Sequence, residues 1–212
     1  MPNIIDPEEY KKEHKGNLKT LLKIYWNNKP IWKSYFFWTA IVLTLISQVV
    51  IVLTSASFYD SINYVANQMM SIMPNILGFN LGGYVLLIGL NSQNILDEIT
   101  EPVKPSKYSL FQMQSSVFAF SILVQASSIL IGYMIMGIMN LGANIFLPVE
   151  LARTINFIGF ILLNFISLYS LILIGQIVIN IFNFGQILHF FVRLERLEKE
   201  FEEDEKQKNK RP

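Results

Sequence analysis

The chain has 212 residues, of which 52% are hydrophobic and only 16% are charged, whereas a soluble domain carries about 25% charged residues. Its mean hydropathy is +0.38. Cysteine is absent, which excludes thiol–disulfide oxidoreductases, thiolate metal sites and disulfide-stapled extracellular modules. The composition therefore excludes an ordinary soluble domain and points to a membrane protein.

Four long stretches contain no Asp, Glu, Lys or Arg: 34–59, 61–96, 108–149 and 154–192. Each exceeds the roughly 18–20 apolar residues that a helix needs to cross a bilayer. We therefore expect an all-α, integral membrane four-helix bundle with spans at about 34–54, 75–91, 115–139 and 154–181. The first apolar run is longer than the core of a secretory signal, so we expect a retained helix.

Two flanking segments also carry helical patterns. In the arm at residues 1–33, the stretch Asp6 to Trp26 places apolar residues on one face, which indicates a docking surface or a helix resting on lipid headgroups. In the segment after the first span, one face is apolar and the other is polar, which predicts a short helix lying flat on the outer leaflet. Its apolar face consists of Ile62, Val65, Ala66, Met69, Ile72 and Met73, and its polar face of Asn63, Asn67, Gln68 and Ser71.

The basic residues are distributed very unevenly. Sixteen of the seventeen lie in the arm, in the loop between the second and third spans, and in the tail at 183–212, while Arg153 alone lies elsewhere. Because Lys and Arg concentrate on the cytoplasmic side of membrane proteins, we expect a multi-pass bacterial inner-membrane protein with both termini in the cytoplasm.

Chemistry-bearing residues are scarce within the spans. No ionisable side chain lies at the centre of any predicted span. A proton-coupled carrier needs such a group within the membrane, so the sequence does not predict one. His14 and His189 are far apart in the sequence, without metal-ligand spacing, and no hydrolase, phosphate-loop or zinc-protease motif is present. We therefore expect no catalytic, cofactor-binding or metal-ligating residues and no cofactor; the chain is not predicted to be an enzyme.

Glycines mark one face of the second span. Gly78, Gly82 and Gly89 follow one another at intervals of four and seven residues, and small residues let another helix approach closely within lipid. The third span repeats the pattern more weakly with Ser121, Gln125, Ser128 and Gly132. The partner helix is either in the same subunit or in another one.

The tail shows the 3–4 spacing of a coiled coil. We call these residues the tail seam: Ile187, Phe190, Leu194, Leu197 and Phe201. Extending the register back into the fourth span reaches Asn183, Asn180 and Gln176, which we call the polar seam. These amides either meet across an oligomer axis or pair within one subunit, for example with Ser47 and Gln48, and the span and tail are predicted to form one rod of about 50 residues.

The run Pro74-Asn-Ile-Leu-Gly-Phe-Asn-Leu-Gly-Gly-Tyr84, together with the size, four-span topology and charged tail, resembles the membrane subunits of the Kiwa anti-phage defence system. The resemblance implies a homo-oligomer that responds to phage at the envelope, with a cytosolic DNA-binding companion. It places DNA binding in the partner, so we expect no direct nucleic-acid binding by this chain.

The combined interpretation is a non-enzymatic, homo-oligomeric sensor or scaffold that detects envelope perturbation and recruits a cytosolic protein through the arm and tail. Nearly all charge is predicted to face the cytoplasm, while the opposite side carries short segments with little charge. The alternative is a pore-forming effector that depolarises the cell.

Overall fold

The computed structural model describes residues 16–28, 30–89, 99–100, 107–140 and 148–208. Within these residues the fold is all-helical. The elements, in chain order, are α2 (Leu18–Asn28), the 3₁₀ turn η1 (Ile31–Lys33), α3 (Tyr35–Thr54), α4 (Phe58–Gly89), α6 (Leu110–Asn140) and α7 (Val149–Lys208).

Local sequence signals explain several helix ends. The Asn17 side chain accepts a hydrogen bond from the Thr20 backbone N–H at 2.8 Å, which caps α2. At α6, Ser109 and Gln112 form a reciprocal capping box, each side chain accepting from the other residue's backbone N–H at 3.1 Å. Helix α3 ends at Ser55, which adopts a left-handed conformation with φ 53°.

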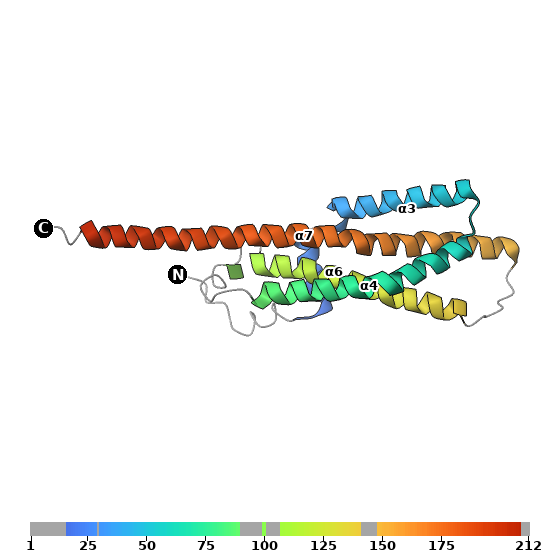
Figure 1. The fold of residues 1–212 in the computed structure, drawn as a ribbon, viewed down its shortest axis with the longest axis horizontal. Coiled ribbons are helices and arrows are strands. Elements are labelled where there is room, and N and C mark those ends of the chain that lie inside the picture. Colours follow the sequence, from blue (N-terminus) through green and yellow to red (C-terminus); the bar gives the residue numbers. More distant parts are fainter. Residues whose placement is uncertain (1–15, 29, 90–98, 101–106, 141–147, 209–212) are drawn as a thin grey trace.

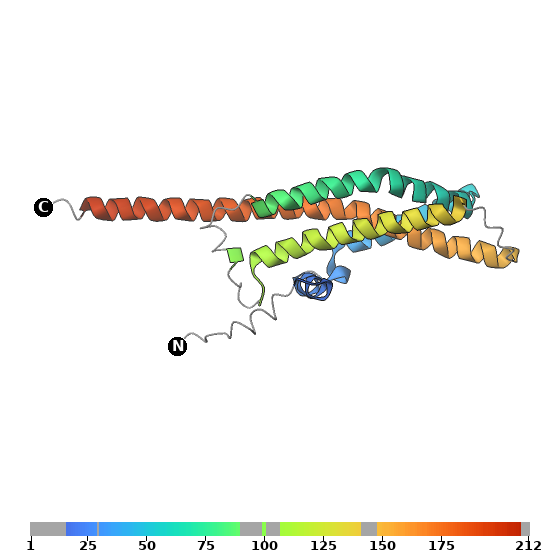
Figure 2. The same cartoon turned by 90° about the horizontal axis from the view of Figure 1, so that it is seen from below.

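The helices form an elongated bundle (Figure 1). Helices α4, α6 and α7 pack against one another, whereas α3 packs mainly against α7. Helix α2 lies across the bundle, because it is seen end-on when the other helices run along the page (Figure 2). We call the end at which α3 joins α4 the distal end.

Three clusters of buried side chains form the core. One lies at α2 and contains Tyr25, whose ring stacks on Phe120 with centroids 3.9 Å apart. The second joins the first half of α4 to α6 and α7, and includes Met69 and Leu163. The third is built around Phe118 of α6 and Ile177 of α7. Apolar burial of this kind favours the folded bundle.

Among the described residues, three helices are long and apolar enough to cross a membrane: α3, α6 and α7. They correspond to the first, third and fourth predicted spans, at 34–54, 115–139 and 154–181. Helix α4, which contains the second predicted span, is 32 residues long but is not in this set. The structure thus confirms an all-helical protein with three membrane-capable helices.

The prediction of a separate, flat helix before the second span is wrong. Residues 58–89 form one continuous helix with Pro74 inside it, rather than at its first turn. Most of the apolar face that was expected to rest on lipid is buried in the bundle instead, with Ala66 and Met69 fully inaccessible, while Ile72 stays 40% exposed. Burial against α6 and α7 compensates for the backbone hydrogen bond that proline cannot make.

Helix α7 is the longest element, with 60 residues, or about 90 Å at 1.5 Å per residue. It passes through the bundle and projects beyond every other helix (Figure 1). The predicted rod joining the fourth span to the tail is therefore present, and Gly175 and Gly185 do not interrupt it. Residues 6–15 of the predicted arm helix and residues 90–91 of the second span lie outside the described residues.

Candidate functional site

Buried amides connect the three central helices. Asn80 of α4 donates from Nδ2 to Oε1 of Gln125 on α6 at 2.7 Å, and Nε2 of Gln125 donates to the backbone carbonyl of Ser170 on α7 at 3.3 Å. Both amide side chains are at most 1% exposed. Because an unpaired amide is costly in an apolar interior, this bridge fixes the register of the three helices.

A second polar group lies where α2 crosses the bundle. The Tyr25 hydroxyl lies near the Gln176 amide and the Tyr169 hydroxyl, yet none of these side chains forms a hydrogen bond within the described residues. Burial raises the pKa of Tyr25, and the proximity of Gln176 and Tyr169 offsets part of that rise. The Tyr25 hydroxyl therefore remains a neutral donor at physiological pH.

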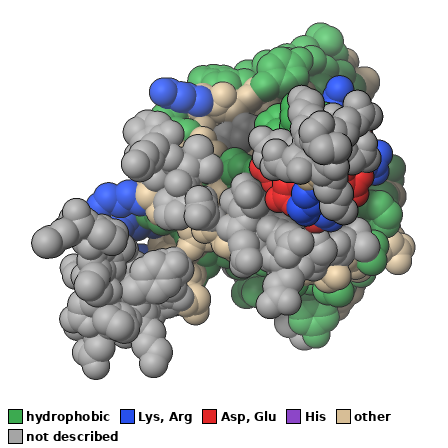
Figure 3. Space-filling view, turned by 90° about the vertical axis from the view of Figure 1, so that its left-hand side faces the viewer, with side chains coloured by type: hydrophobic (Ala, Val, Ile, Leu, Met, Phe, Trp, Pro, Cys, Tyr) green, Lys and Arg blue, Asp and Glu red, His purple; other side chains and the backbone are tan. Residues whose placement is uncertain are grey.

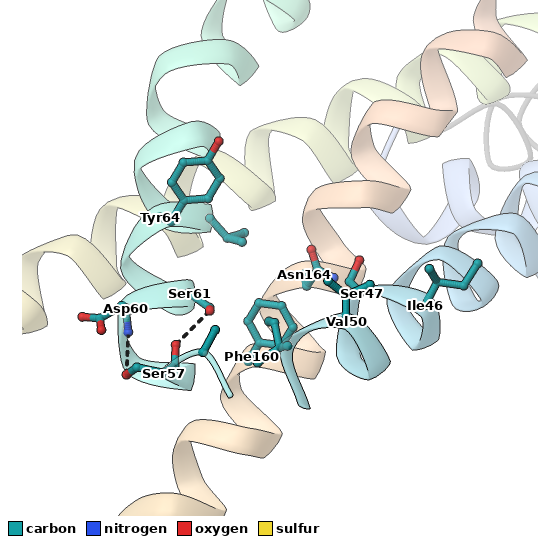
Figure 4. Close-up of a pocket in the computed structure, with 12 residues that line it drawn as sticks. Ile46, Ser47, Val50, Ser57, Asp60, Ser61, Tyr64, Phe160 and Asn164 are labelled. Atoms are coloured by element: carbon teal, nitrogen blue, oxygen red, sulfur yellow. Dashed lines mark hydrogen bonds between the residues drawn. The ribbon is translucent and has the colours of Figure 1, made fainter. Parts of the chain in front are cut away.

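A groove of about 630 Å³ opens between α3, α4 and α7 near the distal end. Helices α3 and α4 splay apart there, and Phe160 and Asn164 of α7 form the floor between them (Figure 4). The walls include Val50 of α3 and Tyr64 of α4. We call this the distal groove; its mostly apolar wall suits an acyl chain or another apolar group.

Asn164 is the notable polar group of the distal groove. Its side chain is 7% exposed and its Nδ2 atom has no hydrogen-bond partner in the described part of the chain. In Figure 4 it lies beside Ser47 of α3, whose hydroxyl donates to the carbonyl of Leu43 at 2.8 Å. The groove therefore offers one unpaired amide donor within an apolar wall.

The polar seam is divided by the fold. Gln176 and Asn180 are buried inside the protomer, at 0% and 6% exposure, while Asn183 is exposed. Gln176 lies near the Tyr25 hydroxyl, rather than near the suggested partners Ser47 and Gln48. The burial of Gln176 and Asn180 favours packing of these amides within one subunit over their meeting across an oligomer axis.

The predicted glycine face is open in the protomer. A side chain added at Gly78, Gly82 or Gly89 would meet no atom within 4 Å. The close approach occurs instead at Gly132 of α6, where an added Cβ would lie 3.1 Å from the Cβ of Met69. Of the two predicted faces, the weaker one on α6 packs within the subunit, and contact of the α4 face with another subunit remains a prediction.

The tail seam begins at the bundle and continues into the projecting rod. Ile187 is half-buried and packs against the third core cluster, whereas Phe190, Leu194, Leu197 and Phe201 are exposed along α7. Viewed from this end, acidic and basic side chains gather around the rod (Figure 3). Two salt bridges link neighbouring turns, Lys199–Glu195 at 2.9 Å and Lys206–Glu202 at 3.5 Å. Coiled-coil pairing of this seam remains a prediction.

Sequence reasoning did not single out Asn80 or Asn164. Each is a lone amide within an apolar run, and that is the signal that could have identified them, because lipid offers no partner to such a group. Among the described residues, no group of three His, Asp or Glu side chains is placed to hold a metal ion.

Comparison with protein-family models, with curated proteins and with solved structures finds no match to this chain. The fold and its surface therefore define a class only: an all-helical protein with three membrane-capable helices and a long helical extension.

Proposed function

We propose that the chain is a homo-oligomeric, non-enzymatic sensor or scaffold of the bacterial inner membrane that acts in anti-phage defence. It detects envelope perturbation and recruits a cytosolic DNA-binding protein through its arm and tail. The resemblance of the Pro74–Tyr84 run to Kiwa membrane subunits supports the defence role. The continuity of α7 supports the signalling role.

In this proposal α3, α4, α6 and α7 all cross the membrane and both termini lie in the cytoplasm. The three tryptophans of the chain cluster where α2, η1 and α3 meet: Trp26 and Trp32 pack edge-to-face, and Trp38 donates to the Trp32 carbonyl at 2.8 Å. Tryptophan prefers the membrane interface. The 20 residues of α3 then extend about 30 Å from that level, the thickness of the hydrocarbon core.

One observation carries the sensor proposal. Helix α7 forms the floor of the distal groove through Phe160 and Asn164, and the same uninterrupted helix carries the tail seam. A change in what fills the groove would shift or rotate a rigid rod, so a membrane event at the distal end would be felt by a partner bound at the tail. A helix with a break between the two regions would not transmit such a movement.

The membrane placement is tested with reporter fusions. Fusions after Lys107 and at the C-terminus should report a cytoplasmic location, and a fusion at Ala56, between α3 and α4, should report the opposite side. Ala56 is a better position than Asn67, which lies inside α4, and the other outer-loop position, Gly142, lies outside the described residues. A cytoplasmic signal at Ala56 would overturn the four-span arrangement.

The signalling role is tested at the tail. Leu194→Asp places a charge on the tail seam, whereas Val192→Asp places the same charge off it, and the two side chains are equally exposed at 39% and 40%. We expect Leu194→Asp to abolish protection in a phage-challenge assay and recovery of the cytosolic partner, and Val192→Asp to retain both. Equal effects of the two variants would count against a seam-specific partner.

The second candidate is a pore-forming effector. The exposed amides of Asn63, Asn67 and Asn75 on α4 favour it, because amides at membrane depth can line an aqueous path. A potential-sensitive dye separates the two functions. Rapid depolarisation on overexpression without any partner protein would support the pore, and an unchanged membrane potential would support the sensor.

A further inference from the structure

Helix α4 has two unlike faces. The face turned into the bundle is apolar and includes Ile62, Ala66, Met69 and Met73, all buried. The opposite face is exposed and carries a row of small and polar residues, with the larger Tyr64 and Val85 also exposed on that side. We call it the α4 stripe: Asn63, Asn67, Ser71, Asn75, Gly78, Gly82 and Gly89. Their intervals of three, four and seven residues place them along one side of the helix.

The polar half of the α4 stripe lies at the depth of α3. The first half of α4 occupies the same part of the bundle's long axis as α3, and both helices pack against α7 (Figure 1). Helix α3 exposes apolar side chains such as Leu45 and Val49 there. Lipid tails that suit α3 cannot hydrogen-bond to the amides of α4. The α4 stripe therefore requires a different neighbour from the one that covers α3.

The amides of the stripe are only partly satisfied by their own helix. Asn67 donates from Nδ2 to the backbone and side-chain oxygens of Asn63, at 2.9 and 3.1 Å. Asn75 donates from Nδ2 to the Ser71 carbonyl at a long 3.4 Å. The Asn67 and Asn75 side-chain oxygens remain as acceptors, and the Asn63 amide nitrogen as a donor, on the outer surface of the helix.

The glycine half of the stripe has the shape of a helix-packing surface. Gly78 and Gly82 leave open space where a side chain would stand. The neighbouring Phe79 and Leu86 are 69% and 62% exposed and form a ridge beside it, while Val85, 65% exposed, lies between Gly82 and Gly89 on the same face. Glycines four residues apart between larger apolar residues allow two helix backbones to approach closely in a membrane.

We propose that the α4 stripe is the surface through which a second copy of this chain binds, with α4 packed against α4. A second copy is the complementary partner for two reasons. No charged residue lies between Asn63 and Gly89, and the nearest charge on that side of α4 is Asp60, one turn earlier. The stripe itself therefore carries no like charges, and every asparagine offers both a donor and an acceptor to its own kind. This inference rests on the proposed membrane placement and adds to it the surface of self-association.

The absence of cysteine makes the test direct. Single substitutions Asn67→Cys, Ser71→Cys and Gly82→Cys lie on the stripe, and Ile72→Cys lies on the same helix off the stripe. Val50→Cys on α3 and Leu162→Cys on α7 are exposed controls on other helices. The full-length protein in native membranes is oxidised with copper phenanthroline, and the cross-linked dimer is quantified by electrophoresis.

We expect several-fold more cross-linked dimer at the three stripe positions than at the three controls. Equal cross-linking at Ile72→Cys and Ser71→Cys, or none at any stripe position, would overturn the proposal. Labelling of Asn67→Cys by a charged maleimide without cross-linking would show a water-filled path in place of a second copy, and would overturn it as well.

A second variant keeps the test independent of the cysteine chemistry. Gly82→Leu adds bulk at the stripe and should reduce cross-linking at Ser71→Cys several-fold. Gly137→Leu on α6, where an added side chain also meets no atom within 4 Å, should leave it unchanged. Failure of the membrane placement is recognised separately, because Ala56→Cys would then be labelled from the cytoplasmic side rather than from outside.

Discussion

Helices α3 and α4 meet at the distal end and both pack against α7 (Figure 1), yet the side chains that they expose near that end differ. Helix α3 turns Thr44 and Gln48 inward and exposes Leu45 and Val49. The first half of α4 instead buries Ala66 and Met69 and exposes the amide of Asn67. Side chains at equal depth in one bundle therefore face different surroundings. In the proposed membrane placement, lipid would cover α3 and a second copy would cover α4, and each experiment below tests one side of that contrast.

The largest effect is expected from a charge on the lipid-facing side of α3. Leu45→Asp should prevent stable insertion, because a charged residue at the centre of a membrane helix costs about 2.5–3.5 kcal/mol. The measurement is the carbonate-resistant fraction of tagged protein, with Leu45→Ala as the neutral control. On α4 at comparable depth, Asn67→Leu should insert normally but lose self-association. Equal self-association of Asn67→Leu and the parent would contradict the contrast.

The next effect concerns the buried side of α4. Gly132→Leu forces a side chain into the contact with Met69, where a Cβ would lie at 3.1 Å, and overpacking of a filled core costs about 1–3 kcal/mol. Thermal unfolding of the detergent-solubilised protein should show a clearly lower unfolding temperature than that of the parent protein. Gly137→Leu on the same helix should leave the unfolding temperature unchanged. If both variants lower it equally, the α4–α6 contact is not close-packed.

A smaller effect is expected at the amide bridge. Asn80→Leu and Gln125→Leu each remove one partner of the 2.7 Å hydrogen bond and should destabilise the protein by about 1 kcal/mol. A double-mutant cycle should give a coupling of about 0.6–1.7 kcal/mol, the range measured for hydrogen bonds inside membrane proteins. Strictly additive effects would mean that the two amides do not act as a pair.

The smallest effect is expected at the outward glycines. Gly78→Leu and Gly82→Leu add side chains where the protomer has no atom within 4 Å, so protomer stability should change by less than about 0.5 kcal/mol. Thermal unfolding at a dilution that yields monomers measures this, alongside dimer cross-linking in membranes. A loss of protomer stability as large as that of Gly132→Leu would place these glycines inside the subunit.

Several features were predictable because they depend on local chemistry. The uncharged runs predicted helices at 34–54, 115–139 and 154–181, and the absence of a breaking proline predicted that the last helix would continue into the tail. The start of α4 was harder to predict, because Pro74 suits a first helical turn and is also tolerated within a packed membrane helix. Only the surface of α6 and α7 decides between these roles.

The sequence by itself determined the hydrophobic lengths, the helical class and the spacing of the glycines and amides, since these follow from composition and from 3.6 residues per turn. Tertiary structure alone decided which face of each helix is covered. It buried Gln176 near Tyr25 of α2, it buried Asn180 within the bundle, and it used Gly132 rather than Gly82 for close packing. The physical reason is that periodicity identifies a face, whereas burial depends on which neighbouring helix the connecting loops bring against it.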